Sequence, residues 1–341
     1  MAVGGRRAKP RAPGVTPQWR MRSLRAALQS ARAGPDVKTP TISIARAFIL
    51  VLALATTAAG AQELEPRAYS PAPVGANFLL FGYTYQTGDV LFDPSLPFFD
   101  VVANVSSANL SYGRSFNLFG RTATVALAVP GAWGSISGNV FEEQRSITRS
   151  GLADVRGRFV VNLMGGPALS PREFAAAPPR TTLGFSLGVT APTGEYDPEK
   201  LINLGAHRWA LKPELGLSHP RGPWTLEAAA GVWLFEDNDD FFPGGVVRSQ
   251  DPLWTVQGHV GYTFKHQLWV SIDATFYAGG ETFADGVGGD TRQENSRIGA
   301  TLSLPLKRGH TIKLLVAKGV TARVGSSFET YSVAYQFLWF D

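Results

Sequence analysis

The hydrophobic and polar positions of this chain alternate with a period of two residues over many separate stretches. The clearest case is residues 182–190, where every second residue from Leu183 to Val189 is apolar and the others are small or polar. Side chains on a β-strand point alternately to opposite faces, so this stretch predicts a strand with one apolar face. The alternation resumes in residues 209–217 after a polar loop, which predicts a hairpin.

Twelve stretches of this kind follow one another between residues 77 and 341. They cover approximately residues 79–86, 101–116, 122–129, 154–163, 182–190, 209–217, 224–235, 254–264, 268–276, 297–304, 311–318 and 330–339. Most are close to the roughly 9–11 residues that a tilted membrane strand needs, and bacterial barrels have an even number of strands. The pattern predicts an all-β fold, a transmembrane antiparallel β-barrel of about 12 strands.

The connections between these stretches alternate in length. Long ones follow the odd-numbered strands, near residues 87–100, 135–151, 191–207, 236–251 and 278–295, and short ones follow most even-numbered strands. Long extracellular loops and short periplasmic turns are typical of outer-membrane barrels. Residues 165–180 are the exception, and we expect residues 171–177 to form one helical turn on the periplasmic side.

The apolar strand faces could instead form the core of a secreted soluble β-protein. Aromatic residues gather near the strand ends, as in the two girdles of a membrane barrel. They are Tyr83, Tyr85, Tyr112, Trp209, Trp224, Trp254, Tyr262, Phe264, Phe276, Phe337 and Trp339. This placement favours a barrel in the bacterial outer membrane, with the apolar faces toward lipid.

Residues 1–61 have the three parts of a secretory signal. Arg46 precedes a short apolar run at 47–55, and small residues end at Ala59-Gly60-Ala61, an A-x-A cleavage site. We expect cleavage after Ala61, with Met21 as a candidate later start. Residues 62–76 are predicted to be a Pro-rich periplasmic lead and 77–341 the barrel.

Composition excludes several kinds of function. Ten of the 32 basic residues but only one of the 27 acidic residues lie in residues 1–61, so the rest of the chain is net acidic. Nucleic-acid binding is therefore not expected. The chain has no cysteine, which excludes disulfides, thiol catalysis and cysteine-ligated metals.

The strand faces opposite the apolar ones carry charged and polar residues that would line the barrel lumen. They are Asp154, Arg156, Arg158, Lys212, Glu214, Glu227, Gln257, His259, Asp273 and Lys313. They could form a selectivity or gating network. Alternatively, opposite charges pair across neighbouring strands and fill the barrel. A barrel of this width needs internal filling or an inward-folded loop.

The sequence gives weaker signals for catalysis, for ion binding and for contacts with lipopolysaccharide. There is no G-x-S-x-G motif, and spacing cannot place Ser271 beside His259, so we expect no enzymatic activity, no cofactor and no metal. The acidic cluster at 236–240 lacks the spacing of a calcium loop and is interpreted as a solvated loop. Basic residues near the outer rim could pair with lipopolysaccharide phosphates or be solvated; they are Arg292, Arg297, Lys318 and Arg323.

Two segments resemble a known family. The first begins Ala191-Pro192-Thr193-Gly194-Glu195-Tyr196-Asp197-Pro198 and continues through residues 203–205, 207–209 and 212–218, and the second spans 235–242 and 250–253. They are similar to the outer-membrane channels or transporters of the meta-pathway of phenol degradation, over about residues 69–340. The alternation before the C-terminus reaches Trp339 and overruns at Phe340 and Asp341, which departs from the usual terminal aromatic residue.

The resemblance implies an outer-membrane channel for passive uptake of small, aromatic or hydrophobic molecules. The alternative is a non-conducting structural or adhesive barrel that acts through its extracellular loops. Expected partners are outer-membrane lipid and lipopolysaccharide, the barrel-assembly machinery and a small-molecule solute, with no nucleic acid.

Overall fold

The computed structural model describes residues 64–91, 98–140, 143–307 and 309–340. The predicted signal region at 1–61 and its cleavage site lie outside the described residues. No helix in the described part of the chain is long and apolar enough to cross a membrane.

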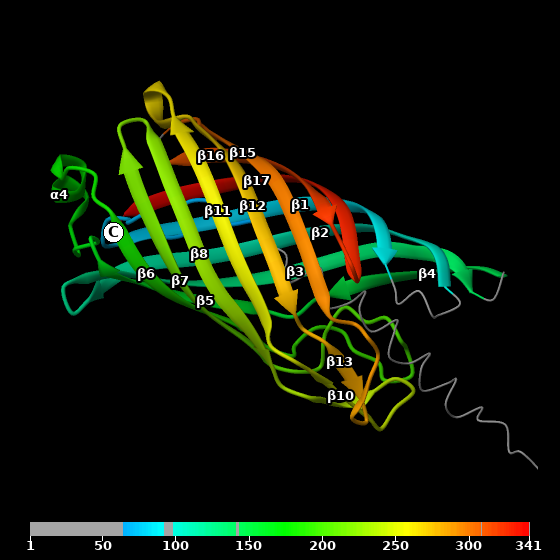
Figure 1. The fold of residues 1–341 in the computed structure, drawn as a ribbon. Coiled ribbons are helices and arrows are strands. Elements are labelled where there is room, and N and C mark those ends of the chain that lie inside the picture. Colours follow the sequence, from blue (N-terminus) through cyan, green and yellow to red (C-terminus); the bar gives the residue numbers. More distant parts are fainter. Residues whose placement is uncertain (1–63, 92–97, 141–142, 308, 341) are drawn as a thin grey trace, which may run out of the picture. The chain divides into compact units, whose positions relative to one another are not determined.

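Twelve antiparallel strands form a closed barrel (Figure 1). Each strand pairs with its neighbours in the chain, and the first, β1, pairs with the last, β17, which closes the sheet. The strands are β1 (Ala76–Leu91), β2 (Phe98–Leu118), β3 (Arg121–Val140), β5 (Arg156–Met164), β6 (Thr182–Thr190), β7 (Ala210–Arg221), β8 (Trp224–Phe235), β11 (Leu253–Thr263), β12 (Trp269–Gly279), β15 (Gln293–Pro305), β16 (His310–Thr321) and β17 (Gly325–Phe340). The predicted fold class and strand order are confirmed.

The faces of these strands are inverted relative to a soluble protein. On β11, Trp254 and Val256 are 61% and 56% exposed, whereas Thr255 and Gln257 between them are 2% and 3% exposed. The apolar side chains therefore form the outer surface, and the buried interior is polar. An apolar outer band around a polar interior is the arrangement of a transmembrane barrel in the outer membrane, and it rules out the soluble alternative.

The turns at one end of the barrel are tight. Phe119 and Gly120, with φ of 50° and 79°, connect β2 to β3. Two successive residues with positive φ make the kind of two-residue turn that fits the twist of a hairpin. The one α-helix among the described residues, α4 (Pro171–Ala176), lies in the long connection at this end, where a helical turn was predicted. Ser170 and Glu173 cap its first turn in a capping box.

The long connections at the other end are more ordered than expected. The segment 135–151, predicted as a loop, extends β3 and forms β4 (Glu143–Leu152), which pairs with it. Two other predicted loops supply a separate four-stranded sheet of β9 (Asn238–Phe241), β10 (Val246–Gln250), β13 (Thr282–Ala284) and β14 (Val287–Gly288). Parts of this sheet lie beyond the ends of β11 and β12 in Figure 1.

Strand length differs around the barrel. The adjacent strands β17, β1, β2 and β3 have 16 to 21 residues. Strands β5 to β8 have 9 to 12 residues. The extra length lies at the end with the long loops, so one side of the wall extends further than the other.

Candidate functional site

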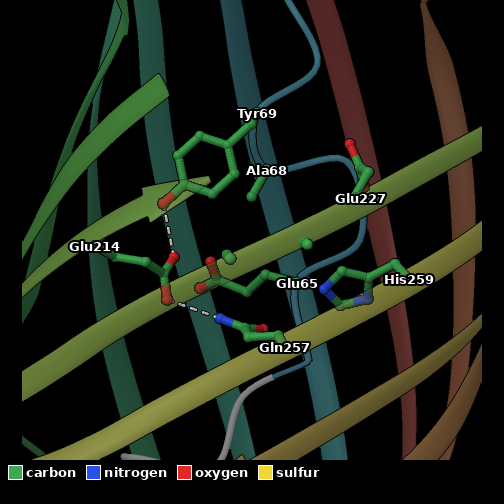
Figure 2. A pocket seen from close by; sticks show the side chains of 9 residues that line it. Glu65, Ala68, Tyr69, Glu214, Glu227, Gln257 and His259 are labelled. Atoms are coloured by element: carbon green, nitrogen blue, oxygen red, sulfur yellow. Dashed lines mark hydrogen bonds between the residues drawn. The ribbon is translucent and has the colours of Figure 1, made fainter. Parts of the chain in front are cut away.

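The segment that precedes β1 lies inside the barrel. Its side chains contact inward-facing residues of β6, β7, β8 and β11 (Figure 2). The sequence predicted a Pro-rich periplasmic lead at 62–76. Within it, Glu65, Arg67 and Tyr69 contact inward-facing wall residues. We call residues 64–75 the N-terminal segment.

Tyr69 anchors this segment near the middle of the wall. Its hydroxyl donates to Glu214 Oε1 at 2.7 Å and lies 2.9 Å from Ser186 Oγ. The ring rests on Gly184 and Gly216, which pair directly between β6 and β7. A Cβ atom at Gly216 would lie only 2.0 Å from the Tyr69 ring, so the absence of a side chain there makes room for the ring.

Arg67 forms a second anchor, closer to the short turns. Its guanidinium donates to Thr263 Oγ1 at 2.6 Å and lies 4.4 Å from the centre of the Trp269 ring. Its backbone N–H donates to Glu227 Oε2 at 2.5 Å. Cation–π contact and a charge-assisted hydrogen bond both strengthen when water is excluded.

Glu214 joins the N-terminal segment to the wall. Besides Tyr69, its carboxylate accepts from Gln257 at 2.8 Å and pairs with Lys212 at 2.8 Å and Arg158 at 3.4 Å. Its side chain is 1% exposed, so removing one cation would leave a buried charge poorly compensated. Arg158 also pairs with Glu65 of the N-terminal segment.

A small space remains between the N-terminal segment and the wall beside Tyr69. Its volume is about 10 Å³, room for roughly one water molecule, and it is bordered by Tyr69, Glu214 and Gln257 (Figure 2). Glu65, Glu227 and His259 also line it. The segment therefore packs closely against this part of the wall.

His259 and Asp273 form a second buried cluster. His259 Nδ1 lies 2.8 Å from Asp273 Oδ1, and the other carboxylate oxygen accepts from Ser271 at 3.1 Å and Thr301 at 2.9 Å. The Ser271 hydroxyl is bonded to the carboxylate rather than to the imidazole. The described side chains therefore do not form the Ser–His pair that an acyl-transfer site needs.

Asp154 has a different place from the one predicted. It precedes β5 instead of lying within a strand, and its two carboxylate oxygens accept from the backbone N–H groups of Gly194 and Ala206, both at 2.8 Å. It holds the loop at 191–207, whose sequence carries the family resemblance. Of the other predicted lumen residues, Arg156, Glu227 and Lys313 are half-buried at inward positions.

The four basic residues predicted at the outer rim differ from one another. Lys318 pairs with Glu329 at 3.1 Å, Arg323 with Asp290 at 2.7 Å and Arg292 with Glu294 at 3.4 Å, all exposed. Arg297 is instead buried and donates to the backbone oxygen of Phe328. Within the described residues, no group of three His, Asp or Glu side chains could hold a metal ion.

Sequence reasoning missed Glu65, Arg67 and Tyr69, because a segment without period-two alternation gives no sign of where it packs. Its one indirect signal is the pair of inward glycines, Gly184 and Gly216. Inward positions without side chains on two neighbouring strands leave a space that another part of the chain must fill.

The chain is similar to several solved structures, and the first of them supports the fold. An outer-membrane channel from Pseudomonas putida F1 is 21% identical, covers 81% of this chain and 100% of its own, and has a TM-score of 0.68. The β domain of the Bordetella autotransporter BrkA is 13% identical, with 78% and 100% covered and a TM-score of 0.45. The transport unit of the Escherichia coli autotransporter AIDA-I is 10% identical, with 85% and 96% covered and a TM-score of 0.45.

A comparison with curated proteins found no match. The family model described as the MetA-pathway of phenol degradation matches residues 82–337, which include nearly all of the barrel. This match confirms the resemblance that the sequence of the 191–218 and 235–253 segments indicated. The chain therefore belongs to the phenol-degradation MetA-pathway family and has the fold of an outer-membrane β-barrel.

Proposed function

We propose that this protein is an outer-membrane channel for the passive uptake of small molecules, and that its N-terminal segment controls passage. The observation that carries the proposal is the segment's position in the lumen. It is tied by Tyr69 and Arg67 to polar wall residues, and the space beside Tyr69 and Glu214 is only about 10 Å³.

The contacts between the N-terminal segment and the barrel wall can break without unfolding the barrel. Within the described residues, the N-terminal segment forms no strand pairing with the wall. Most of its contacts with the wall involve side chains, and its last residues, Val74 and Gly75, also donate backbone hydrogen bonds to Leu169 and Ser115. A segment held by a few hydrogen bonds, each of net worth about 1 kcal/mol, opens at far lower cost than a strand of the barrel. Displacing it would open a lumen lined by charged and polar side chains.

The family and the fold of the Pseudomonas putida channel support small molecules as cargo, and the family description favours aromatic ones. No coupling to energy is proposed, because the barrel interior offers a diffusion path once the segment moves. The other nine predicted lumen residues, from Arg156 to Lys313, would then set selectivity, with Glu214 and its cations beside Tyr69.

Conductance and liposome swelling with the purified mature protein test this proposal. Wild type is expected to conduct weakly. A double variant, Arg67→Ala with Tyr69→Ala, is expected to conduct several-fold more, because it removes both anchors. A matched control with Tyr83→Ala and Tyr85→Ala changes two outward-facing side chains and is expected to conduct as wild type. Absence of flux for every solute in both wild type and the double variant would support the alternative, a structural or adhesive barrel.

A further inference from the structure

Two buried arginines lie in the loops at the long-loop end of the barrel. Arg208 precedes β7 and Arg248 lies in β10, and they are 2% and 3% exposed. Neither side chain forms an ion pair with a described residue. Burying a cation without a partner costs several kcal/mol, so a protein rarely leaves two such groups together without a counter-charge.

Their contacts hold the two guanidinium groups near each other. Arg208 Nη2 donates to the side-chain oxygen of Gln250, whose amide donates to the backbone oxygen of Gly280 at 3.1 Å. Gln250 and Arg248 are two residues apart on β10 and so share one face of that strand. Burial, reinforced by the charge of Arg248, holds the pKa of Arg208 well below its usual range.

Several donors of the pair are unused. Arg208 Nη1 and Arg248 Nε and Nη2 are buried and have no hydrogen-bond partner among the described residues. Nε and Nη2 form one edge of a guanidinium, with two parallel N–H groups. That edge matches the two oxygens of a carboxylate in a bidentate pair.

The neighbouring carboxylates do not supply the missing partner. Asp154 is near enough to raise the pKa of Arg208, but its two oxygens accept from Gly194 and Ala206. Asp237 also acts on Arg208 from a distance, and its side chain is exposed. Burial lowers the pKa of Arg248 to about 10, so Arg248 remains cationic at neutral pH.

The surroundings of the pair are aromatic. Arg208 lies 4.6 Å from the centre of the Phe235 ring, and Arg248 lies 5.4 Å from that of Phe241. One face of each guanidinium therefore lies against a ring, and the unused, buried N–H groups lie on the guanidinium edges. A small organic acid, with a carboxylate for the donors and an apolar body for the rings, satisfies both features.

We propose that Arg208 and Arg248 form a binding site for the carboxylate of a small organic acid at the extracellular entrance of the barrel. Such a site would concentrate solute for the proposed channel. Binding is measured without flux, so a failed binding test and a failed conductance test are distinguishable.

Calorimetric titration of the purified, folded full-length mature protein with benzoate tests the site. Benzoate is expected to bind, and benzamide, its neutral analogue, at least tenfold more weakly. Arg208→Gln and Arg248→Gln are each expected to weaken benzoate binding at least tenfold. Arg145→Gln, which removes an exposed arginine paired with Glu143, is expected to leave it unchanged. Equal binding of benzoate and benzamide, or no loss in either buried-arginine variant, would overturn the proposal.

Two further measurements keep the test decisive. Arg208→Lys retains the charge but lacks the planar guanidinium with its parallel N–H groups. It is also expected to weaken benzoate binding at least tenfold. Benzoate is expected to raise the thermal midpoint of wild type and not that of Arg248→Gln. Inorganic phosphate that binds as tightly as benzoate would overturn the assignment to carboxylates. An unshifted midpoint of wild type in saturating benzoate would overturn the site itself.

Discussion

The Tyr69 hydroxyl donates a hydrogen bond of 2.7 Å to the carboxylate of Glu214, although 145 residues separate them along the chain. The bond ties the N-terminal segment to the inward face of β7. Glu214 also contacts Lys212 and Gln257. Movement of the N-terminal segment would therefore change the contacts of these polar wall residues.

Tyr69→Phe removes this hydrogen bond and keeps the ring. A buried carboxylate that loses a donor is destabilised by about 1–3 kcal/mol, so we expect that loss in the unfolding free energy, together with more frequent opening in single-channel recordings. Tyr83→Phe is the matched control, since the Tyr83 hydroxyl contacts Ser106 on the exposed face. Equal recordings from the two variants would show that the hydroxyl does not hold the segment.

Gly216→Ala tests the space beneath the Tyr69 ring. The new Cβ would lie 2.0 Å from a ring carbon, so the ring must leave its place. We therefore expect conductance to rise, as we also expect for Tyr69→Ala. Gly258→Ala is the control, because the nearest atom to its Cβ lies 4.0 Å away. In a Tyr69→Ala background Gly216→Ala is expected to add nothing, and a further increase there would contradict the model.

Leu187→Arg places a charge on the lipid-facing side of β6, where Leu187 pairs with Phe159 and Pro213. Near the midplane this costs about 2–4 kcal/mol. We expect a lower yield of the heat-modifiable folded form on gels of protein refolded into vesicles. Phe119→Arg, at a turn where Phe119 is 97% exposed, is expected to cost about 0–1 kcal/mol. Wild-type assembly of Leu187→Arg would mean that this face does not meet lipid.

Asp154→Ala frees the backbone N–H groups of Gly194 and Ala206. Hydrogen bonds to a charged group contribute about 1.5–3 kcal/mol each, so the loop at 191–207 should open locally while the barrel stays folded. Hydrogen exchange of this loop is expected to accelerate at least tenfold. The exposed Glu199 offers a control within the same loop, and Glu199→Ala should leave the exchange rates unchanged.

The strands were predictable because lipid and a polar lumen impose opposite demands on alternate residues. The alternation from Leu183 to Val189 marks β6 without error, and the order of all twelve barrel strands follows from the same rule. The extension of β3 into the β4 hairpin was not predictable. Polar residues occupy both faces of β4, with Arg145 and Arg149 on one of them. The sequence therefore shows no apolar–polar alternation there.

The polar character of the interior was predictable from the sequence, but the contacts between its side chains were not. The inward positions of Arg158, Lys212 and Glu214 follow from strand phase. Their pairing does not follow the predicted pattern of neighbouring strands, because Lys212 pairs with Glu214 on the same strand and Arg158 pairs with Glu214 across β6. The contribution of Tyr69 depends on a contact between distant parts of the chain. Such contacts are set by three-dimensional packing, which local periodicity does not record.

The unequal strand lengths make the barrel asymmetric around its axis, with long strands on one side and short strands on the other. At about 3.3 Å per residue, the 20 residues of β3 span about 66 Å, roughly twice the span of the nine residues of β6. The long side extends as paired strands, whereas the chain continues from β8 and β12 into loops and the separate four-stranded sheet. A solute or a neighbouring protein therefore meets this barrel differently according to the direction of its approach.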